Sequence, residues 1–128
     1  MDTSETYIKM CDCEEIQDEW QFKDGDFCVD LEIHGQNLYV LSKDWRPDFS
    51  ESGFTWLPRQ DQIQEVMNWG YVKFYEQMYH FVGKLVSHGK YYQALIGSGM
   101  TCEKATLAFY MHEKHGKVWD GKNWRSNP

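Results

Sequence analysis

The segment Phe54–Met67, with the sequence FTWLPRQDQIQEVM, changes from strand-like to helix-like residues at Pro58. Phe54–Leu57 is an aromatic and apolar run, which predicts a short strand. Pro58 suits the first position of a helix, where its missing N–H costs nothing. Apolar residues return at Ile63 and Met67 with helical spacing. The segment therefore predicts a strand followed directly by a helix, in a fold that mixes both kinds of element.

The residues before this segment predict an antiparallel hairpin. In Phe27–His34, the apolar residues Phe27, Val29, Leu31 and Ile33 alternate with Cys28, Asp30, Glu32 and His34. This period of two is typical of a half-buried strand. A turn at His34–Asn37 and an apolar run at Leu38–Leu41 follow, and they predict a second strand that pairs with the first.

Helical spacing dominates the remainder of the chain. Thr3–Trp20 predicts a helix that Asp2 caps, with a break near Asp12 as an alternative. Tyr71–Ser87 has the clearest three- and four-residue apolar spacing, and Gly89 is expected to end it. The residues that we expect this helix to bury are Tyr71, Phe74, Tyr75, Met78, Phe81, Val82 and Leu85. Three further expected elements are a helical turn at Tyr91–Ile96, a helix from Thr101 to His115 ended by Gly116, and a small hairpin around Asp120–Gly121.

These elements define the expected fold class. The chain has 128 residues, which fits one domain and buries roughly two-thirds of the surface of the unfolded chain. We expect a single α+β domain over residues 1–128, with three or four helices packed on a small, mostly antiparallel sheet.

Formal charge is distributed unevenly along the chain. The net charge is −7, with 16 acidic and 5 basic residues in residues 1–67 but 4 acidic and 8 basic residues in residues 68–128. The acidic half would repel phosphates, so we expect no direct nucleic-acid binding there and favour a basic partner. An ordinary solvated acidic face is the alternative.

The composition favours a cytoplasmic protein without a membrane partner. No apolar run approaches the ~20 residues that a membrane helix needs. Residues Met1–Glu15 have neither the basic nor the apolar region of a signal peptide. We therefore expect the four cysteines to be free thiols rather than disulfides.

Three motifs stand out along the chain. They are CEEIQDEW at Cys13–Trp20 followed by Gly25-Asp26-Phe27, WLPRQDQIQ at Trp56–Gln64, and GKVWDGKNW at Gly116–Trp124. Together they resemble a family of small uncharacterised proteins encoded by bacterial phages and prophages. The resemblance implies a phage or prophage origin and action in the cytoplasm of the infected host, and it transfers no catalytic residue. Small acidic phage proteins include inhibitors of host defence, such as anti-CRISPR proteins.

A run of carboxylates is the first candidate for a partner-binding surface. It comprises Asp12, Glu14, Glu15, Asp18, Glu19, Asp24 and Asp26. Carboxylates in such a run could imitate phosphates and occupy a basic nucleic-acid channel on a partner.

A polar box is the second candidate, as a ligand or recognition site. It comprises Trp56, Arg59, Gln60, Asp61 and Gln62. The free N–H groups of the first helical turn could hold an anion with the help of Arg59, and the helix dipole favours Asp61 at this place. Alternatively, these residues form only the structural start of the helix.

Support for a metal site or for catalysis is weak. The other candidates are Cys11-x-Cys13, His112 with His115, Cys28 with His34, and Gly97-Ser98-Gly99. Cys11-x-Cys13 is too short for a zinc knuckle, and His112 with His115 does not match an HExxH motif. Cys28 and His34 are too far apart along one strand to be in contact, and Gly97-Ser98-Gly99 lacks the spacing of a phosphate-binding loop. We therefore expect no enzyme, no metal and no cofactor.

We expect a non-catalytic, phage-encoded interaction protein that inhibits a basic host or defence protein through its acidic N-terminal half. One alternative is a module that binds a small, nucleotide-like anion at the polar box. Another is a phage structural or assembly protein, which self-associates or forms a groove through rings such as Tyr79 and Tyr91-Tyr92.

Overall fold

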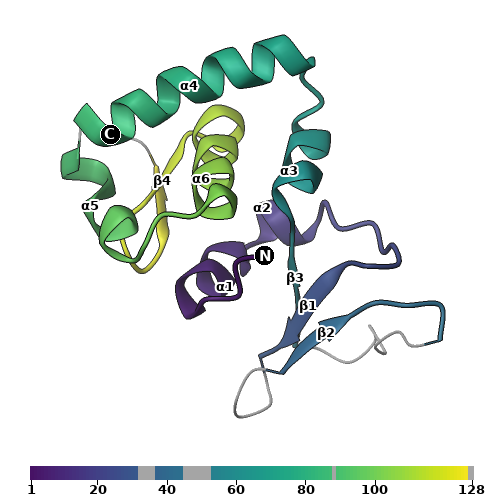
Figure 1. Ribbon diagram of the computed structural model, residues 1–128. Coiled ribbons are helices and arrows are strands. Elements are labelled where there is room, and N and C mark those ends of the chain that lie inside the picture. The colour runs from purple at the N-terminus through teal and green to yellow at the C-terminus, as the bar shows by residue number, and fades with distance from the viewer. Residues whose placement is uncertain (32–36, 45–52, 88, 127–128) are drawn as a thin grey trace. The chain divides into compact units, whose positions relative to one another are not determined.

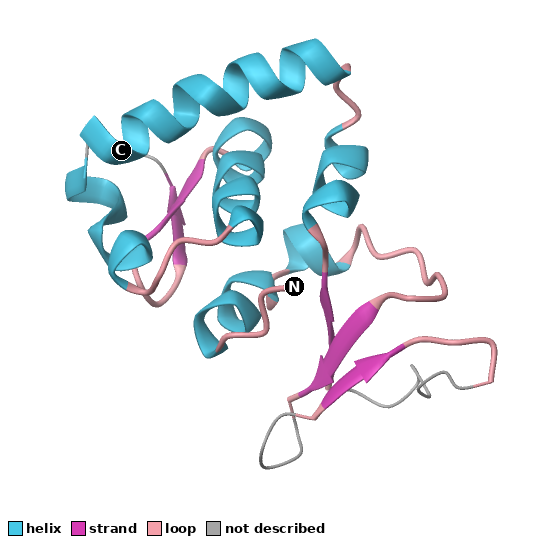
Figure 2. Ribbon diagram, viewed as in Figure 1, coloured by secondary structure: helices cyan, strands magenta, loops and turns pink. Residues whose placement is uncertain are grey.

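The structure, a computed structural model, describes residues 1–31, 37–44, 53–87 and 89–126, with the side chains of residues 86–91 outside the described set. The elements in chain order are α1 (Glu5–Cys11), α2 (Glu14–Gln17), β1 (Phe27–Asp30), β2 (Leu38–Val40), β3 (Phe54–Leu57), α3 (Gln60–Met67), α4 (Tyr71–Ser87), α5 (Gly89–Gly97), α6 (Cys102–His115), β4 (Lys117–Trp119) and β5 (Trp124–Ser126). Helices together with small antiparallel sheets confirm the α+β class (Figure 2).

The chain forms two compact units, which are described separately (Figure 1). The first comprises Thr3–Pro58 and contains α1, α2 and β1 to β3. We call it the acidic unit, because it has 13 acidic and 4 basic residues. The second comprises Met1–Asp2 and Arg59–Pro128 and contains α3 to α6, β4 and β5, so we call it the helical unit. The expectation of a single domain over residues 1–128 stays a prediction.

The sheet of the acidic unit has the strand order β2-β1-β3 and is antiparallel. Phe27 of β1 lies opposite Val40 of β2, which confirms the predicted pairing, and β3 confirms the predicted third strand. Cys28 and Val29 are both buried. The middle of β1 is therefore covered on both faces, and the predicted half-buried alternation is wrong there. The predicted continuation of this strand and its turn, at residues 32–36, lies outside the described residues.

The predicted N-terminal helix is instead two short helices, α1 and α2. The alternative of a break near Asp12 is confirmed, because this residue has φ −78° and ψ 67°, outside the helical region. Ser4 caps α1 by accepting a hydrogen bond from the Tyr7 N–H at 3.2 Å. The prediction of Asp2 as the cap is wrong, because its carboxylate accepts from the Thr101 hydroxyl at 2.6 Å within the helical unit.

Helices α1 and α2 hold the edge strand β3 through two side chains. The Tyr7 hydroxyl donates to the Pro58 carbonyl at 2.7 Å. The Gln17 amide accepts from the Trp56 N–H at 2.8 Å and donates to the Trp56 carbonyl at 3.1 Å. Gln17 therefore satisfies the edge of the sheet in the way that a neighbouring strand would.

Helix α6 forms the core of the helical unit, where Lys104–Met111 are all buried. It contacts α3, α4 and β4. The Phe109 ring meets the rings of Phe74 and Phe81, with centroid separations of 5.6 and 5.4 Å. As predicted, Thr101 caps the helix by accepting from the Lys104 N–H at 3.2 Å. Aromatic burial of this kind stabilises the unit.

Lys104 is a buried cation, with 2% of its surface exposed. Its Nζ donates to the Gly99 carbonyl at 2.7 Å and the Ser98 carbonyl at 3.2 Å, and lies 3.8 Å from the Asp2 carboxylate. A buried charge needs such partners, because desolvation is otherwise very costly. This network joins the first residues of the chain to the start of α6.

The start and end of α3 differ from the prediction. Pro58 precedes the helix instead of opening it, and Arg59 is the N-cap. The reason is Gln62, whose side-chain oxygen accepts from the Arg59 N–H at 2.9 Å and fixes Gln60, two residues after Pro58, as the first helical residue. The helix ends at Asn68, which adopts the left-handed conformation with φ 53°, rather than at the predicted Trp69-Gly70.

The long helix predicted at Tyr71–Ser87 is confirmed as α4. Gly89 does not end the helical region but opens α5, which extends the helical turn that was predicted there. Tyr92 and Leu95 of α5 are buried, at 6% and 0% exposure. Burial of this face stabilises α5 as a helix that begins at Gly89.

The predicted C-terminal hairpin is confirmed by β4 and β5, where Trp119 lies opposite Trp124. Gly121 in its turn has φ 102°, a conformation that residues with a side chain rarely adopt. A Cβ at this position would also lie 2.8 Å from the Cβ of Ala94. The turn thus requires glycine.

Candidate binding surfaces

Exposed carboxylates of the acidic unit come from the end of α1, from α2 and from the loop before β1. Of the predicted residues, Asp12, Glu14, Asp18, Glu19 and Asp24 are exposed and Glu15 is half-buried. We call these six residues the acidic surface. The helical unit, in contrast, has 7 acidic and 9 basic residues. Negative charge is therefore concentrated in one of the two units.

Asp26, which was predicted to belong to this surface, is buried, with 1% exposure. Its carboxylate accepts from the Trp20 Nε1–H at 3.0 Å and from the Lys23 N–H at 2.9 Å. Its backbone carbonyl accepts from the Leu41 N–H at 2.9 Å. The prediction of a partner contact is wrong for Asp26, because these bonds make it a structural residue of the loop before β1.

Arg59 and Asp61 of the polar box form an ion pair at the start of α3. The Arg59 Nε lies 3.1 Å from the Asp61 Oδ1, and the side chains are 37% and 69% exposed. Gln60 is half-buried. Gln62 is buried, at 8% exposure, and its side-chain oxygen accepts from the N–H of the N-cap residue Arg59. These contacts explain the box as a helix start. An exposed ion pair contributes only ~0–1 kcal/mol, so an external group can compete for either partner.

Trp56 is not a surface residue of the box, and that part of the prediction is wrong. Its side chain is 4% exposed and stacks on Trp20, with ring centroids 6.1 Å apart and planes at 2°. Its buried Nε1–H has no hydrogen-bond partner among the residues that the structure describes. The ring belongs to the core of the acidic unit.

Cys28 has the properties of a structural cysteine. Burial, together with the nearby charges of Asp26 and Asp30, raises the pKa of its thiol to about 11. The nucleophile in cysteine chemistry is the thiolate, so this thiol is a poor nucleophile near neutral pH. Its candidate partner His34 lies outside the described residues.

The two histidines near the end of α6 face different partners. His112 Nδ1 lies 3.3 Å from a Glu113 carboxylate oxygen, and His115 Nε2 lies 3.2 Å from the Tyr110 hydroxyl. Within the described ranges, three or more metal-binding side chains do not come together anywhere. The geometry of this helix end is explained by local hydrogen bonds.

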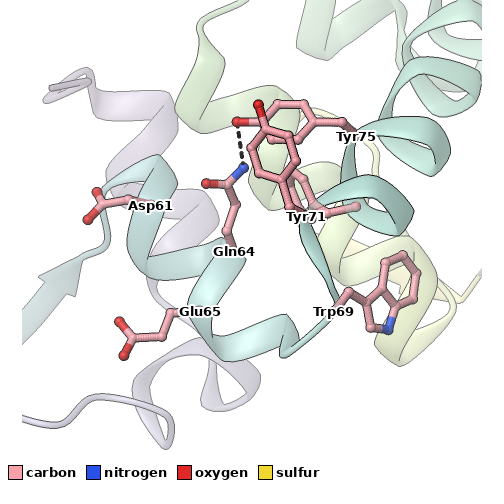
Figure 3. A pocket seen from close by; sticks show the side chains of 7 residues that line it. Asp61, Gln64, Glu65, Trp69, Tyr71 and Tyr75 are labelled. Carbon is pink, nitrogen blue, oxygen red and sulfur yellow. Dashed lines mark hydrogen bonds between the residues drawn. The ribbon is translucent and has the colours of Figure 1, made fainter.

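A pocket of about 310 Å³ opens in the helical unit between α3 and the start of α4 (Figure 3). Its lining residues are Asp61, Gln64, Glu65, Trp69, Tyr71, Phe74 and Tyr75. The Gln64 Nε2 donates to the Tyr75 hydroxyl at 3.0 Å. We call this site the α3–α4 pocket. Of its residues, the sequence indicated only Asp61 as a candidate site residue, although the spacing of Asp61, Gln64 and Glu65 places all three on one face of a helix.

Helix α4 also carries an exposed apolar stripe. Its residues are Tyr71, Val72, Tyr75, Tyr79 and Val82, with exposures of 78%, 75%, 43%, 77% and 39%. We call it the α4 stripe. The expected burial is confirmed for Phe74, Phe81 and Leu85 but is wrong for Tyr71, Tyr75 and Val82. Contiguous exposed apolar residues with polar neighbours are typical of interaction sites.

Tyr79 and Tyr92, two of the rings that the sequence suggested for a groove, differ in their exposure. Tyr79 is exposed on the α4 stripe, whereas Tyr92 is buried against Phe81, with ring centroids 5.7 Å apart. The side chain of Tyr91 lies outside the described residues. Of these rings, Tyr79 alone is placed on a surface by the described part of the chain.

Comparison of the chain with protein-family models, with curated proteins and with solved structures found no match. In the described ranges, every helix is too short or too polar to cross a lipid bilayer. The functional argument therefore depends on the charges, contacts and exposures given above.

Proposed function

We propose that this chain is a non-catalytic interaction protein, encoded by a phage or prophage, that binds and inhibits a basic host or defence protein in the host cytoplasm. The observation that supports this proposal is the concentration of 13 acidic and 4 basic residues in Thr3–Pro58, with five exposed carboxylates around α2. A protein surface that carries one sign of charge attracts partners of the opposite sign over long range.

The partner that best suits such a surface is a protein with a basic nucleic-acid channel. Exposed carboxylates such as Glu14, Asp18 and Glu19 would take the place of phosphates and block that channel. Charge complementarity of this kind accelerates association and selects the partner. The function requires neither a cofactor nor a metal, and the acidic unit itself does not bind nucleic acid.

The test is a double variant of the acidic surface, Glu14→Gln with Glu19→Gln. We expect its affinity for a basic partner captured from host cells to fall roughly two- to thirtyfold, because two exposed ion pairs are lost and each contributes ~0.2–1 kcal/mol. The affinity of the unaltered protein should also fall as salt rises from about 0.1 M to about 1 M, where screening shortens from ~10 Å to ~3 Å. Calorimetric titration measures both effects.

The matched control is Glu5→Gln with Glu76→Gln, which removes the same charge from exposed carboxylates outside the acidic surface. We expect it to bind nearly as well as the unaltered protein. A functional assay completes the test, since the partner should lose nucleic-acid binding when the complex forms. A salt-insensitive complex, or equal losses in both double variants, would contradict the proposal.

A further inference from the structure

The exposed side of α4 carries a row of apolar side chains at the spacing of paired helices. Helix α4 lies at the edge of the helical unit (Figure 1). The row comprises Val72, Tyr75, Tyr79 and Val82, which follow one another at steps of three, four and three residues. Alternating steps of this kind average 3.5 residues and direct a row of side chains at one neighbouring helix. We call these four residues of the α4 stripe the α4 seam.

All four residues of the α4 seam are exposed, although a row with this spacing is usually buried between two helices. Helix α4 contacts the core through Phe74 and Phe81, whose rings meet the Phe109 ring of α6. Its contact with the core therefore uses a different face. The seam is an apolar helix face that the described part of the helical unit does not cover.

The order of residues in the α4 seam is the same from both ends. It reads Val, Tyr, Tyr, Val, and its steps of three, four and three are symmetric as well. In a twofold contact between two copies, residue i meets residue j and residue j meets residue i. When two such helices run antiparallel, Val72 lies opposite Val82 and Tyr75 lies opposite Tyr79. Each layer then joins residues of equal size, which most apolar rows do not achieve with an antiparallel copy of themselves.

Electrostatics allow this contact between two copies. The α4 seam consists of valine and tyrosine, so none of its side chains brings a charge into the contact. The helical unit has 7 acidic and 9 basic residues, and the net negative charge of the chain comes from the acidic unit. In an antiparallel pair, the positive end of each helix dipole also lies beside the negative end of the other.

We propose that a second copy of this chain packs on the α4 seam, with the two α4 helices antiparallel and related by a twofold axis. Four rings, those of Tyr75 and Tyr79 in each copy, form the centre of the contact, and a valine layer closes each end. Aromatic pairs contribute stability beyond the burial of their surface. The proposal goes beyond the proposed function and does not depend on it.

The length of the α4 seam determines the strength that we expect. From Val72 to Val82 the helix rises about 15 Å. A contact of this length buries less than the ~800 Å² per partner of a standard interface. We therefore expect a weak dimer, with a dissociation constant between about 1 µM and about 1 mM.

Light scattering tests the association at protein concentrations from about 10 µM to about 1 mM, the range that this affinity requires. We expect the mass to rise from the 15.3 kDa of one chain towards twice that value. Tyr79→Ala should raise the dissociation constant about tenfold or more, because each dimer loses two central rings. The matched control is Gln77→Ala on α4 outside the seam, which should dimerise as the unaltered protein does. Both side chains are exposed, so folding is preserved.

Chemical cross-linking tests the direction of the two helices. Val72→Cys and Val82→Cys are each made in a Cys102→Ser background, because Cys102 is exposed. In an antiparallel pair, the two copies of position 72 lie about 15 Å apart along the helix axis. A short bis-maleimide should therefore link an equal mixture of the two variants and leave each variant unlinked when it is alone. The control is the Cys102→Ser protein itself, which should stay unlinked.

A mass of 15.3 kDa that does not change with concentration would overturn the proposal. Equal dissociation constants for Tyr79→Ala and Gln77→Ala would also overturn it, and so would efficient linkage of Val72→Cys alone, which would indicate parallel helices. The acidic-surface variant Glu14→Gln with Glu19→Gln should dimerise as the unaltered protein does at about 0.15 M salt, where exposed charges are screened. Dimerisation and the proposed function can therefore fail independently.

Discussion

The side chain of Gln17 hydrogen-bonds to both backbone groups of Trp56 at the edge of the sheet in the acidic unit. It accepts from the Trp56 N–H at 2.8 Å, and its Nε2 donates to the carbonyls of Trp56 and Cys11 at 3.1 and 2.8 Å. An open sheet edge offers unpaired backbone groups to other chains. One glutamine thus both fixes α2 and closes part of this edge.

We expect Gln17→Ala to lower the free energy of unfolding by about 1–3 kcal/mol, because three hydrogen bonds are lost and backbone groups of β3 stay unpaired. Gln21→Ala is the control, since Gln21 is an exposed glutamine of the same unit. Its effect should stay within about 0.5 kcal/mol. Urea denaturation measures both, and equal midpoints for the two variants would contradict the role of Gln17.

Roles of single residues were the least predictable from the sequence. Asp24 and Asp26 flank Gly25 and look equivalent, yet Asp24 is exposed and Asp26 is buried. The difference comes from the folded loop, in which the N–H groups of Trp20 and Lys23 donate to the Asp26 carboxylate. Such partners come together only in the tertiary structure, so composition and spacing cannot distinguish the two aspartates.

At the scale of elements, helical periodicity predicted the position of α4 but only part of its buried face. Phe74, Phe81 and Leu85 have helical spacing, and so do the exposed Tyr71 and Tyr79 on the adjacent side. Apolar residues therefore cover about half of this helix. The sequence cannot show which part of so wide a face contacts α6, and the α3–α4 pocket was missed for the same reason.

The β4–β5 hairpin depends on an ionised Asp120 in its turn. The carboxylate accepts from the N–H groups of Asn123 at 2.7 Å and Lys122 at 2.8 Å, and from Arg125. These bonds, chiefly those to Asn123 and Lys122, lower the pKa of Asp120 from 3.8 to about 2. Because the pKa is lower in the folded state, the stabilisation is complete above the unfolded value and disappears as pH falls through the folded value.

We expect Asp120→Asn to remove this pH dependence while it keeps an oxygen that accepts from the backbone. The difference in unfolding free energy between the unaltered protein and the variant should be constant above about pH 5 and should shrink between about pH 4 and pH 2. Urea denaturation across this range measures it. Glu76→Gln, an exposed change on α4, corrects for general charge effects, and a difference that does not vary with pH would contradict the role of Asp120.

At the scale of the whole molecule, the sequence predicted where the charge lies better than it predicted the division of the chain. The excess of acidic residues was visible in residues 1–67, and the structure concentrates it in Thr3–Pro58. The boundary itself falls between Pro58 and Arg59, inside the motif at Trp56–Gln64. A strand that runs directly into a helix has no linker composition, so no pattern marks this boundary.

We expect residues 1–128 to unfold in one cooperative transition, as small single domains usually do. Amide signals of β1 report on the acidic unit and those of α6 report on the helical unit. Followed by nuclear magnetic resonance across a urea series, both sets should disappear at the same urea concentration. Two separate midpoints would show that the units unfold independently and would contradict the single-domain expectation.

The bonds of Asp2 have a consequence for the order in which the molecule is completed during translation. Asp2 accepts from Thr101, a residue that lies 99 positions later in the chain. The strands and helices of the acidic unit all lie within residues 3–58, which leave the ribosome first. The helical unit must wait for α6. Because Asp2 needs Thr101, the cooperative fold expected for residues 1–128 can be completed only after the start of α6 has been made.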